Sequence, residues 1–366
     1  MTKRMTGTAL SRRGLILAGT LSLATPALIG KARAQSPRKV AMTSGGFETA
    51  ADVAKAEAEG EILFYTHDSD PAAAALMSAF SNDFPKIKAN YLRAQTGALY
   101  SKILAERSAN RFSADVIQFS EIPTAMDFRK RSGFEVYESP QGRAYPAAAL
   151  DDPPNHFFHS GVIFMGIAYN TDRVPEAEAP KTWKDLLDPK WRGTITTKQA
   201  SSGSQFVQWY ELRRLYGDAF WKEFAKQRPK GFDSRAQLFD RLAKGDDKIC
   251  GMAEWAGYQL VKEKGAPVKF VAPADGLPTA TLATGVVNKA PHPEAARLFL
   301  DWLMSPRGQQ VYQTNPFYYY PSLRADAAPM PGGFKLSDYK LLFPDIEKLA
   351  ASHPTFIKDW NGMMGL

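Results

Sequence analysis

The stretch "EILFYTHDSDPAAAALMSAFSNDF" (residues 61–84) decides the fold class. Its apolar first part, Glu61–Thr66, predicts a buried strand, and the remainder predicts a helix with Pro71 in its first turn. The apolar residues of that helix recur at helical spacing; they are Ala73, Leu76, Met77, Phe80 and Phe84. A buried strand that leads straight into an amphipathic helix is the unit from which α/β folds are built.

The same unit is repeated further along the chain. "IKANYLR" (87–93) predicts a second strand, "TGALYSKILAERSANR" (96–111) a second helix, and "ADVIQF" (114–119) a third strand. This alternation predicts a mainly parallel sheet covered by helices on both faces. In such sheets ligands bind beyond the carboxyl ends of the strands, which lie here at Thr66 and His67, at residues 93–97, and at Ser120 and Glu121.

A second α/β region follows the proline-containing segment "DDPPNHFFHS" (151–160). It is expected to contain strands within residues 161–171, 248–254 and 279–289, with helices between them. The helix expected within residues 292–312 is interrupted by Pro306. Since 366 residues exceed the size of one typical core, the sequence predicts two α/β units.

The first residues have the features of an export signal. Arg12 and Arg13 precede a moderately apolar run over residues 14–30, and Ala32-Arg33-Ala34 provides a small-x-small cleavage site. Residues 1–34 are therefore interpreted as a twin-arginine signal peptide, and the mature protein is expected to be soluble in the periplasm. A membrane anchor is disfavoured because the run is short and contains polar residues and a proline.

The leader also accounts for most of the net charge. Its six basic residues supply six of the formal +8 charges, which leaves +2 for the mature chain. A nearly neutral chain gives no indication of nucleic-acid binding. Cys250 is the single cysteine, so it forms no internal disulfide and is expected to be a small buried residue.

A cluster of small residues precedes the helix expected after residue 204. Ser201, Ser202, Gly203 and Ser204 leave hydroxyl groups and backbone N–H groups at a helix start, where the helix dipole favours an anion. A plain serine cap explains the same residues without a ligand. The residues alone leave both interpretations open.

The order of segments resembles a known family from about residue 61 to residue 320. The resemblance is carried by "AYNTDRVPEAEAPKTWKDLLDPKWRGTI" (168–195), "SSGSQ" (201–205), "KEKGAPVKFVAPADGLPTATLATGVVNKAPHPEAARLFLDWLMSPRGQQVY" (262–312) and "YYYPSL" (318–323). In these segments the chain resembles the extracytoplasmic solute-binding proteins of ABC importers, in the branch that includes ferric-iron, thiamine and phosphonate binders.

The resemblance implies a two-lobed periplasmic-binding-protein fold of type II, with a ligand cleft between lobes that close around the solute. The first lobe is then expected to contain residues 41–155 and 284–330, and the second residues 156–283 and 331–366. The resemblance also implies a monomer that delivers a small molecule to the membrane permease of an ABC importer. No catalytic residue, metal or cofactor is expected.

The resemblance places an anion at one helix start, and the position of a second helix start beyond a strand suggests another contact with it. Ser202, Gly203 and Ser204 match the turn that holds an anion in the second lobe of ferric and phosphate-containing members, and Ser201 precedes it. In the first lobe Thr96, Gly97 and Ala98 begin another helix beyond a strand. Facing one cleft, these two helix starts are expected to clamp an oxyanion. Thr66 and His67, at a strand end, are also expected to contact the ligand.

The chain departs from the ferric-binding members at their metal ligands. Ser69 stands where the usual histidine falls, and Trp255 and Ala256 stand in place of the usual pair of tyrosines. An indole and a methyl group give ferric iron no anionic oxygen. The expected ligand is therefore a small organic or phosphorylated anion, with ferric iron as the alternative within the family and an exported enzyme as the alternative outside it.

Aromatic and acidic residues near that position complete the predicted site. Trp255 and Tyr258 are expected to form an apolar wall, and Tyr319 represents the one ring of residues 318–320 that is expected to line the cleft. Glu254 either pairs with a cationic group of the ligand or is an exposed carboxylate at a helix start. Asp68 and Asp70 form no specific acid–base pair, because Asp70 is expected to cap the helix that contains Pro71.

Overall fold

The computed structural model describes residues 38–150, 155–198, 204–232 and 234–365, and residues Arg38–Leu366 form one compact unit. Its strands are β1 (Ala41–Met42), β2 (Glu48–Thr49), β3 (Glu61–Thr66), β4 (Lys88–Arg93), β5 (Val116–Phe119), β6 (Phe158–Asn170), β7 (Ile195–Lys198), β8 (Lys230–Phe232), β9 (Ile249–Glu254), β10 (Val268–Val271), β11 (Leu277–Val286) and β12 (Leu341–Leu342). Its α-helices are α1 (Val53–Glu59), α2 (Asp70–Asp83), α3 (Thr96–Ser108), α4 (Ile122–Lys130), α5 (Ser204–Lys226), α6 (Arg235–Lys244), α7 (Trp255–Glu263), α8 (Pro293–Met304), α9 (Pro306–Thr314) and α10 (Ile346–Met364).

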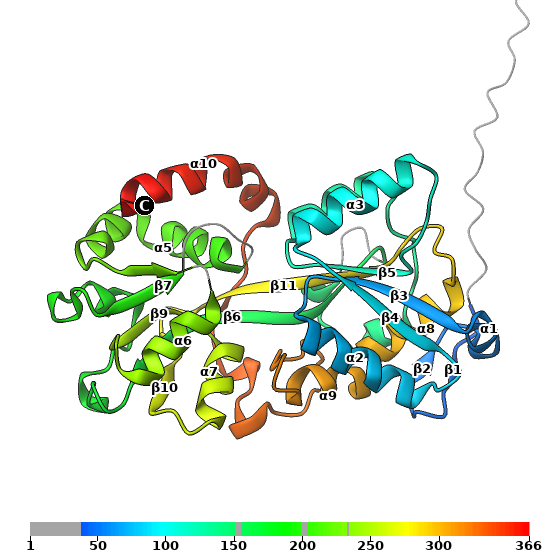
Figure 1. Ribbon diagram of the computed structural model, residues 1–366, viewed down its shortest axis with the longest axis horizontal. Helices are drawn as coiled ribbons and strands as arrows, with labels where there is room; N and C mark the ends of the chain where they lie inside the picture. Colours follow the sequence, from blue (N-terminus) through cyan, green and yellow to red (C-terminus); the bar gives the residue numbers. More distant parts are fainter. Residues whose placement is uncertain (1–37, 151–154, 199–203, 233, 366) are drawn as a thin grey trace, which may run out of the picture. The chain divides into compact units, whose positions relative to one another are not determined.

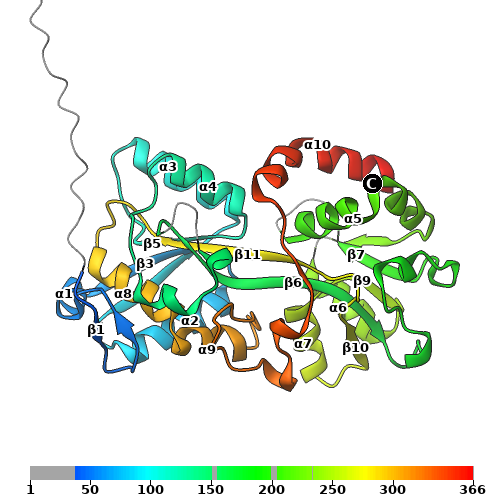
Figure 2. The same ribbon diagram turned by 180° about the vertical axis from the view of Figure 1, so that it is seen from behind.

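Most strands belong to one sheet with the order β4-β3-β5-β11-β6-β9-β7-β8. In the first strand group β3 pairs in parallel with β4 and β5, and in the second strand group β7 pairs in parallel with β8 and β9. The long strands β6 and β11 are antiparallel to each other and connect the two groups, as Figures 1 and 2 show. We call β6 and β11 the crossing strands.

Helices cover both faces of each strand group. In Figures 1 and 2, α3 and α4 lie on one face of the first strand group, and α2, α8 and α9 lie on the other. In the second strand group α5 and α10 lie opposite α6 and α7. Each parallel strand leads into the helix that follows it at its carboxyl end, so the starts of α2, α3, α4, α5, α6 and α7 adjoin those strand ends.

The opening stretch folds as its pattern predicts. β3 has the predicted bounds Glu61–Thr66, and α2 buries an apolar stripe that includes Leu76, Met77 and Phe80. The predicted cap is wrong by one residue: Ser69 occupies the N-cap position, and Asp70 is the first residue of α2. As an acidic residue in the first turn, Asp70 still interacts favourably with the helix dipole.

Proline ends a helix where the sequence indicates it. α8 stops at Met304, the Ser305 hydroxyl accepts a hydrogen bond from the N–H group of Gly308, and α9 begins at Pro306. Around Trp183 the chain forms two short 3₁₀ helices, Trp183–Leu187 and Pro189–Trp191. Pro189 lacks the N–H group that a continuing α-helix needs there.

The C-terminal helix α10 is anchored on α5 by indole rings. Trp360 stacks on Trp209 with ring centroids 4.3 Å apart, and it meets Trp221 edge-on at 4.0 Å. All three rings are buried. This contact keeps the first turns of α10 beside the crossing strands, where they form one wall of a cavity described below.

Candidate functional site

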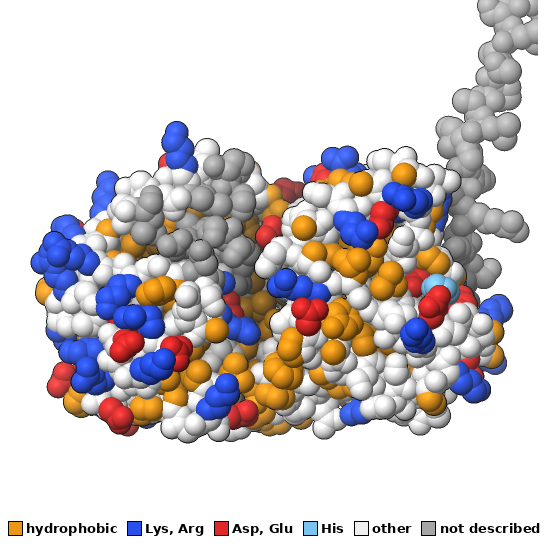
Figure 3. Space-filling view, in the orientation of Figure 1, with side chains coloured by type: hydrophobic (Ala, Val, Ile, Leu, Met, Phe, Trp, Pro, Cys, Tyr) orange, Lys and Arg blue, Asp and Glu red, His pale blue; other side chains and the backbone are white. Residues whose placement is uncertain are grey.

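The carboxyl ends of the parallel strands carry the polar residues of the candidate site. In the first strand group β3 leads into His67 and Asp68, and β5 leads into Ser120. In the second strand group β7 ends at Lys198 and β9 ends at Glu254. Figure 3 shows basic and acidic side chains intermixed on one face of the molecule, with a recess near the middle of that face.

Asp68 is a buried carboxylate without hydrogen-bond partners. Its side chain is 1% exposed, and neither carboxylate oxygen has a partner among the described residues. The N–H group of Asp68 donates to the Thr66 hydroxyl at 3.1 Å, and Arg93 Nε donates to the Asp68 carbonyl at 3.3 Å. The backbone of this residue is thus held in place while its carboxylate stays unsatisfied.

Burial dominates the ionisation of Asp68. It raises the pKa of this carboxyl above the usual value. The charge of His67, the nearby hydroxyl groups of Thr66 and Tyr318, and the charge of Arg235 act in the opposite direction. His67 Nε2 lies 3.7 Å from Oδ1 of Asp68, and His67 Nδ1 is itself buried without a described partner. A buried polar atom without a hydrogen-bond partner lowers the stability of the folded protein. The unpaired atoms of His67 and Asp68 are therefore unusual for buried side chains.

Three tyrosine rings and a glutamine surround the same place. Gln118 accepts a hydrogen bond from the Thr66 hydroxyl at 3.1 Å and donates to the Tyr312 hydroxyl at 2.8 Å. The rings of Tyr312, Tyr318 and Tyr320 pack with centroids 4.7 to 5.7 Å apart. Burial, followed by the negative charge of Asp68, raises the pKa of all three phenols well above the ordinary value.

A second set of charged groups comes from the second strand group. Arg235 donates to Glu254 at 3.1 Å, and Gln205 donates to the other carboxylate oxygen of Glu254 at 2.8 Å. Lys198 Nζ donates to Gln205 Oε1 at 3.0 Å. Burial alone would raise the pKa of Glu254, but the charges of Arg235 and Lys198 outweigh it and lower that pKa.

Arg235 links the two sets of residues electrostatically. Burial acts to lower its pKa, but the charges of Glu254, Tyr320 and Asp68 outweigh burial and raise it. We call Asp68, Arg235, Glu254 and Lys198 the charged junction. It joins an unsatisfied acceptor from the first strand group to two cations from the second. Such a site is suited to a small solute that bears both hydrogen-bond donors and negative charge.

The predicted helix start of the first lobe is present at α3. α3 begins at Thr96, and Gly97 and Ala98 are exposed in its first turn. The Thr96 hydroxyl lies 2.9 Å from the Ser120 hydroxyl and accepts a hydrogen bond from the N–H group of Ser120 at 3.2 Å. Thr96 therefore ties the start of α3 to the end of β5.

Only part of the predicted serine-rich turn can be placed. Ser201, Ser202 and Gly203 lie outside the described residues, whereas Ser204 is the first residue of α5. Its neighbour Gln205 is buried and contacts both Lys198 and Glu254. The start of α5 is thus beside the charged junction.

The residues of the predicted aromatic wall pack against other aromatic rings. Trp255 lies 4.2 Å from Phe334 and 5.1 Å from Phe270 by ring centroids, and Tyr258 lies 5.5 Å from Phe270. These rings fill core between α7 and β10. Tyr319 has a positive φ of 46° and is buried, and its hydroxyl interacts with Glu263. Its neighbours Tyr318 and Tyr320 are the rings that lie close to Asp68.

The structure therefore brings together Thr66, His67 and Glu254 with residues that the sequence did not indicate as site residues. Asp68 had a weak signal, since it follows the end of a predicted strand by two residues. Arg235 had none, because an arginine at the first position of an amphipathic helix is normally solvent-exposed. No group of three or more His, Cys, Asp and Glu side chains in the described parts of the chain is arranged to hold a metal ion.

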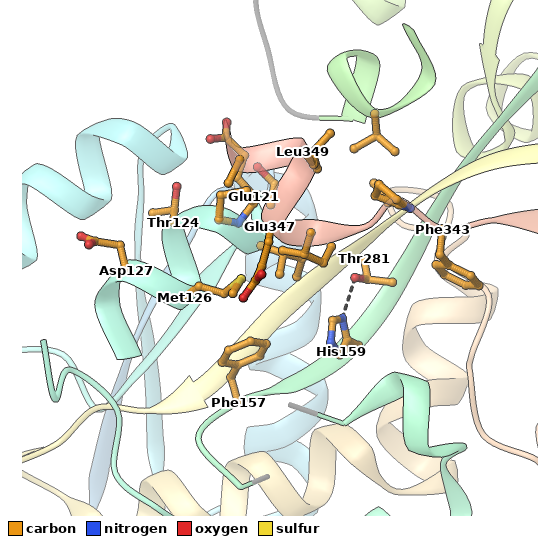
Figure 4. A pocket seen from close by; sticks show the side chains of 18 of the residues that line it. Glu121, Thr124, Met126, Asp127, Phe157, His159, Thr281, Phe343, Glu347 and Leu349 are labelled. Carbon is orange, nitrogen blue, oxygen red and sulfur yellow. Dashed lines mark hydrogen bonds between the residues drawn. The ribbon is translucent and has the colours of Figure 1, made fainter. Parts of the chain in front are cut away.

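A cavity of about 710 Å³ lies between α4, the crossing strands, the start of α5 and α10. Figure 4 shows Phe157, Met126 and Leu349 around it, with His159 at its floor. His159 Nδ1 is 2.6 Å from the Thr281 hydroxyl, and burial lowers the pKa of His159 to about 4. This histidine is thus neutral at physiological pH.

Known proteins share this architecture. The structure of AfuA from Actinobacillus pleuropneumoniae with fructose-6-phosphate has a TM-score of 0.70 at 22% identity, covering 84% of this chain and 99% of that one. Iron-bound HitA from Pseudomonas aeruginosa has a TM-score of 0.71 at 18% identity, covering 82% and 99%. The predicted α/β fold of the two-lobed periplasmic binding proteins is thereby confirmed.

Residues 113–339 match the family described as "Bacterial extracellular solute-binding protein". The chain therefore belongs to this family, as its sequence resemblance indicated. An uncharacterized protein of Haemophilus influenzae is 25% identical over 327 residues, which are 83% of this chain and 91% of that protein. A probable ABC transporter periplasmic-binding protein of Sinorhizobium fredii is 24% identical over 226 residues, covering 58% and 61%. Among the described residues, no helix has both the length and the apolarity needed to cross a membrane.

Proposed function

We propose that this protein captures a small organic or phosphorylated anion in the periplasm and delivers it to the membrane permease of an ABC importer. Export by a twin-arginine signal over residues 1–34, a monomeric state, and the absence of enzymatic activity and of nucleic-acid binding are parts of this proposal. The relative from Sinorhizobium fredii supports the importer, and AfuA with fructose-6-phosphate supports a phosphorylated solute.

The observation that carries the proposal is the charged junction. Buried Asp68 has two unsatisfied oxygens, and its neighbourhood includes the guanidinium of Arg235 from the opposite strand group. A solute with hydroxyl or amino groups would donate to Asp68, while its anionic group would meet Arg235, Lys198 and the start of α5. Both the unpaired carboxylate and the clustered cations are then accounted for by one ligand.

We also propose that the two lobes have the bounds expected from the sequence, residues 41–155 with 284–330 and residues 156–283 with 331–366. The connection of the two strand groups through β6 and β11 supports this division. Two lobes joined by such strands are expected to close on a solute. Small-angle scattering should then show a smaller radius of gyration with saturating ligand, and identical profiles would contradict closure.

A ligand screen of the mature protein tests the proposed function. We would measure thermal shifts with fructose 6-phosphate, phosphonates, thiamine phosphate, carboxylates and ferric citrate, because a bound ligand stabilises the folded state. A hit should bind with one-to-one stoichiometry and without turnover; turnover would indicate an exported enzyme. Arg235→Gln should weaken an anionic hit by roughly tenfold or more, since a hydrogen bond to a charged group contributes about 1.5–3 kcal/mol.

The serine-rich turn provides an independent test of the anion. Ser202→Ala removes a hydroxyl donor, and Gly203→Val blocks approach to the backbone. If this turn holds the anion, affinity falls roughly tenfold in both variants. If it is only a helix cap, the melting temperature falls while affinity stays unchanged, as expected for a loss of about 1 kcal/mol.

Ferric iron remains the second candidate, because three tyrosines lie beside Asp68. Trp255 and Ala256 stand where the ferric-binding members carry their pair of tyrosines, which argues against a tyrosinate site. Protein given ferric citrate should therefore develop no visible tyrosinate-to-iron absorption band. A strong band that is lost in Tyr320→Phe would support iron instead of an organic anion.

A further inference from the structure

None of the four residues of the charged junction lines the cavity beneath α10, but close sequence neighbours of residues that contact the junction do. In the first strand group Ser120 lines the cavity, and Gln118, two residues earlier, contacts Thr66 and Tyr312 beside Asp68. In the second, Phe206 lines the cavity and is the direct neighbour of Gln205, which contacts Glu254. Short segments at the end of β5 and the start of α5 thus connect the lining of the cavity to residues that contact the junction.

The walls of the cavity are mainly apolar. Apolar side chains from α4, α5, α10 and the segment before β6 line it; they include Met126, Phe157, Phe206, Ile346 and Leu349. The neutral His159 and Thr281 at the floor already bind each other. A volume of about 710 Å³ lies within the range of small-molecule sites, roughly 300–1,000 Å³.

Charged residues at the cavity indicate which end of a solute enters it. Glu121, Asp127 and Glu347 line it together with Arg129. Asp127 is occupied by Arg131, whose Nε lies 2.8 Å from it, and by the Tyr100 hydroxyl. With Asp127 paired to Arg131, the carboxylates of Glu121 and Glu347 still outnumber the Arg129 guanidinium and disfavour an anionic group in the cavity. The anionic group of a solute is instead stabilised by the cations of the junction.

We propose that the cavity holds an apolar ring system of the transported solute, so that the solute is an aromatic or alicyclic compound bearing an anionic group. This inference rests on the proposed function and names the class of ligand for the same site. It assigns the apolar wall to α4, α5 and α10 instead of Trp255 and Tyr258. A bare ion or a fully hydrophilic sugar phosphate leaves the apolar walls without a partner.

Two probes with the same anionic group test this assignment. We would compare 1-naphthyl phosphate with methyl phosphate by titration calorimetry, since they differ in the apolar body alone. Naphthyl phosphate should bind at least about tenfold more tightly, because its rings are removed from water. Equal affinities would overturn the inference while leaving the proposed function intact. Failure of both phosphates to bind would overturn the inference and contradict the anion-binding proposal as well.

Cavity-filling variants locate the ring. Ala350→Trp fills the cavity from α10, and Thr124→Phe fills it from α4 on the other side. Ala351→Trp is the matched control, because Ala351 is exposed on α10 and is not among the lining residues. Each filled variant should bring the two affinities within about twofold of each other, whereas the control keeps the tenfold difference. A tenfold difference that persists in both filled variants, with unchanged melting temperatures, would place the ring elsewhere and overturn the inference.

Discussion

Replacing Asp68 by asparagine should stabilise the ligand-free protein and weaken the binding of its solute. In the ligand-free state the carboxylate is buried and both of its oxygens lack partners among the described residues. Asparagine has nearly the same shape but no charge, so the variant avoids the cost of holding an anion out of water. A residue kept for packing alone would show the opposite change in stability.

The surroundings of Asp68 determine how large the changes in stability and affinity should be. An unsatisfied buried polar group costs about 1–3 kcal/mol, and more when it is charged. The charges of His67 and Arg235 offset part of the burial penalty at Asp68. We therefore expect Asp68→Asn to raise the free energy of unfolding by about 1–2 kcal/mol at pH 7. The affinity for the solute should fall roughly tenfold, because a hydrogen bond to a charged acceptor is lost.

The pH dependence follows from the raised pKa of Asp68. In the unfolded chain this carboxyl titrates near 3.8, and burial raises its pKa in the folded protein. Between these two values the folded protein binds the proton more tightly, so lowering the pH through this window stabilises the wild type. The advantage of Asp68→Asn should thus be full above the folded pKa of Asp68 and shrink as the pH falls towards 3.8.

Urea unfolding monitored by tryptophan fluorescence measures the stability, and calorimetry with a hit from the ligand screen measures the affinity. Asp70→Asn is the control, since Asp70 is exposed two residues away and favours the α2 dipole by about 0.3–1 kcal/mol. The control should lose that small amount and keep its affinity. An Asp68→Asn protein that is less stable than wild type and binds the solute equally well would refute this reasoning.

Three further changes have expected outcomes that can be measured on the same protein. Arg235→Gln removes the ion-pair partner of buried Glu254, so the free energy of unfolding should fall by about 1–3 kcal/mol, measured in urea at pH 7. Burial lowers the pKa of His159 from 6.5 to about 4 in the folded protein, so the free energy of unfolding of the wild type falls by at most about 3 kcal/mol as the pH falls from 6.5 to 4. His159→Gln should make the free energy of unfolding less dependent on pH in this range. Trp360→Ala should lower stability by about 3–5 kcal/mol, seen as a drop in melting temperature, because two buried indoles lose their partner.

The fold was largely predictable because its signals are local. β3 has the predicted bounds, and the turn residues Pro306 and Ser305 end one helix and begin the next where the sequence indicates. The helix α1 was missed because its seven residues bury one alanine, which leaves little apolar periodicity to detect. Buried Cys250 confirms the expectation of a small core residue.

The site was predictable only at the ends of strands. Thr66 and His67 follow directly from the rule that ligands lie beyond the carboxyl ends of parallel strands. The role of Glu254 was left open between a ligand contact and an exposed carboxylate, and the structure shows a buried residue paired with Arg235. Burial of this carboxylate depends on α5 and α6 folding over the same strand end, which no local pattern contains.

The aromatic residues show why composition did not locate the apolar surface. Trp255 and Tyr258 have the residue types of a stacking wall, but neighbouring Phe270 and Phe334 cover them. The cavity is lined instead by Phe157, Phe206 and residues of α10, which are separated by about half the chain. Within its own segment, the sequence pattern around each of these residues is that of an ordinary core residue. Only the crossing of β6 and β11, with α10 returning over them, leaves the space between these side chains unfilled.

A network of hydrogen bonds around Asp68 explains why an unsatisfied charge is tolerated there. The backbone around Asp68 is fixed by Thr66 and Arg93, and Gln118 and Tyr312 continue this hydrogen-bonded network towards α9. Rearranging the loop to solvate the carboxylate would break these bonds, each contributing about 0.5–1.5 kcal/mol. That loss is similar to the cost of leaving the carboxylate unpaired. The protein thus holds an acceptor ready for a solute, and the free energy gained when the solute donates to Asp68 contributes to its capture.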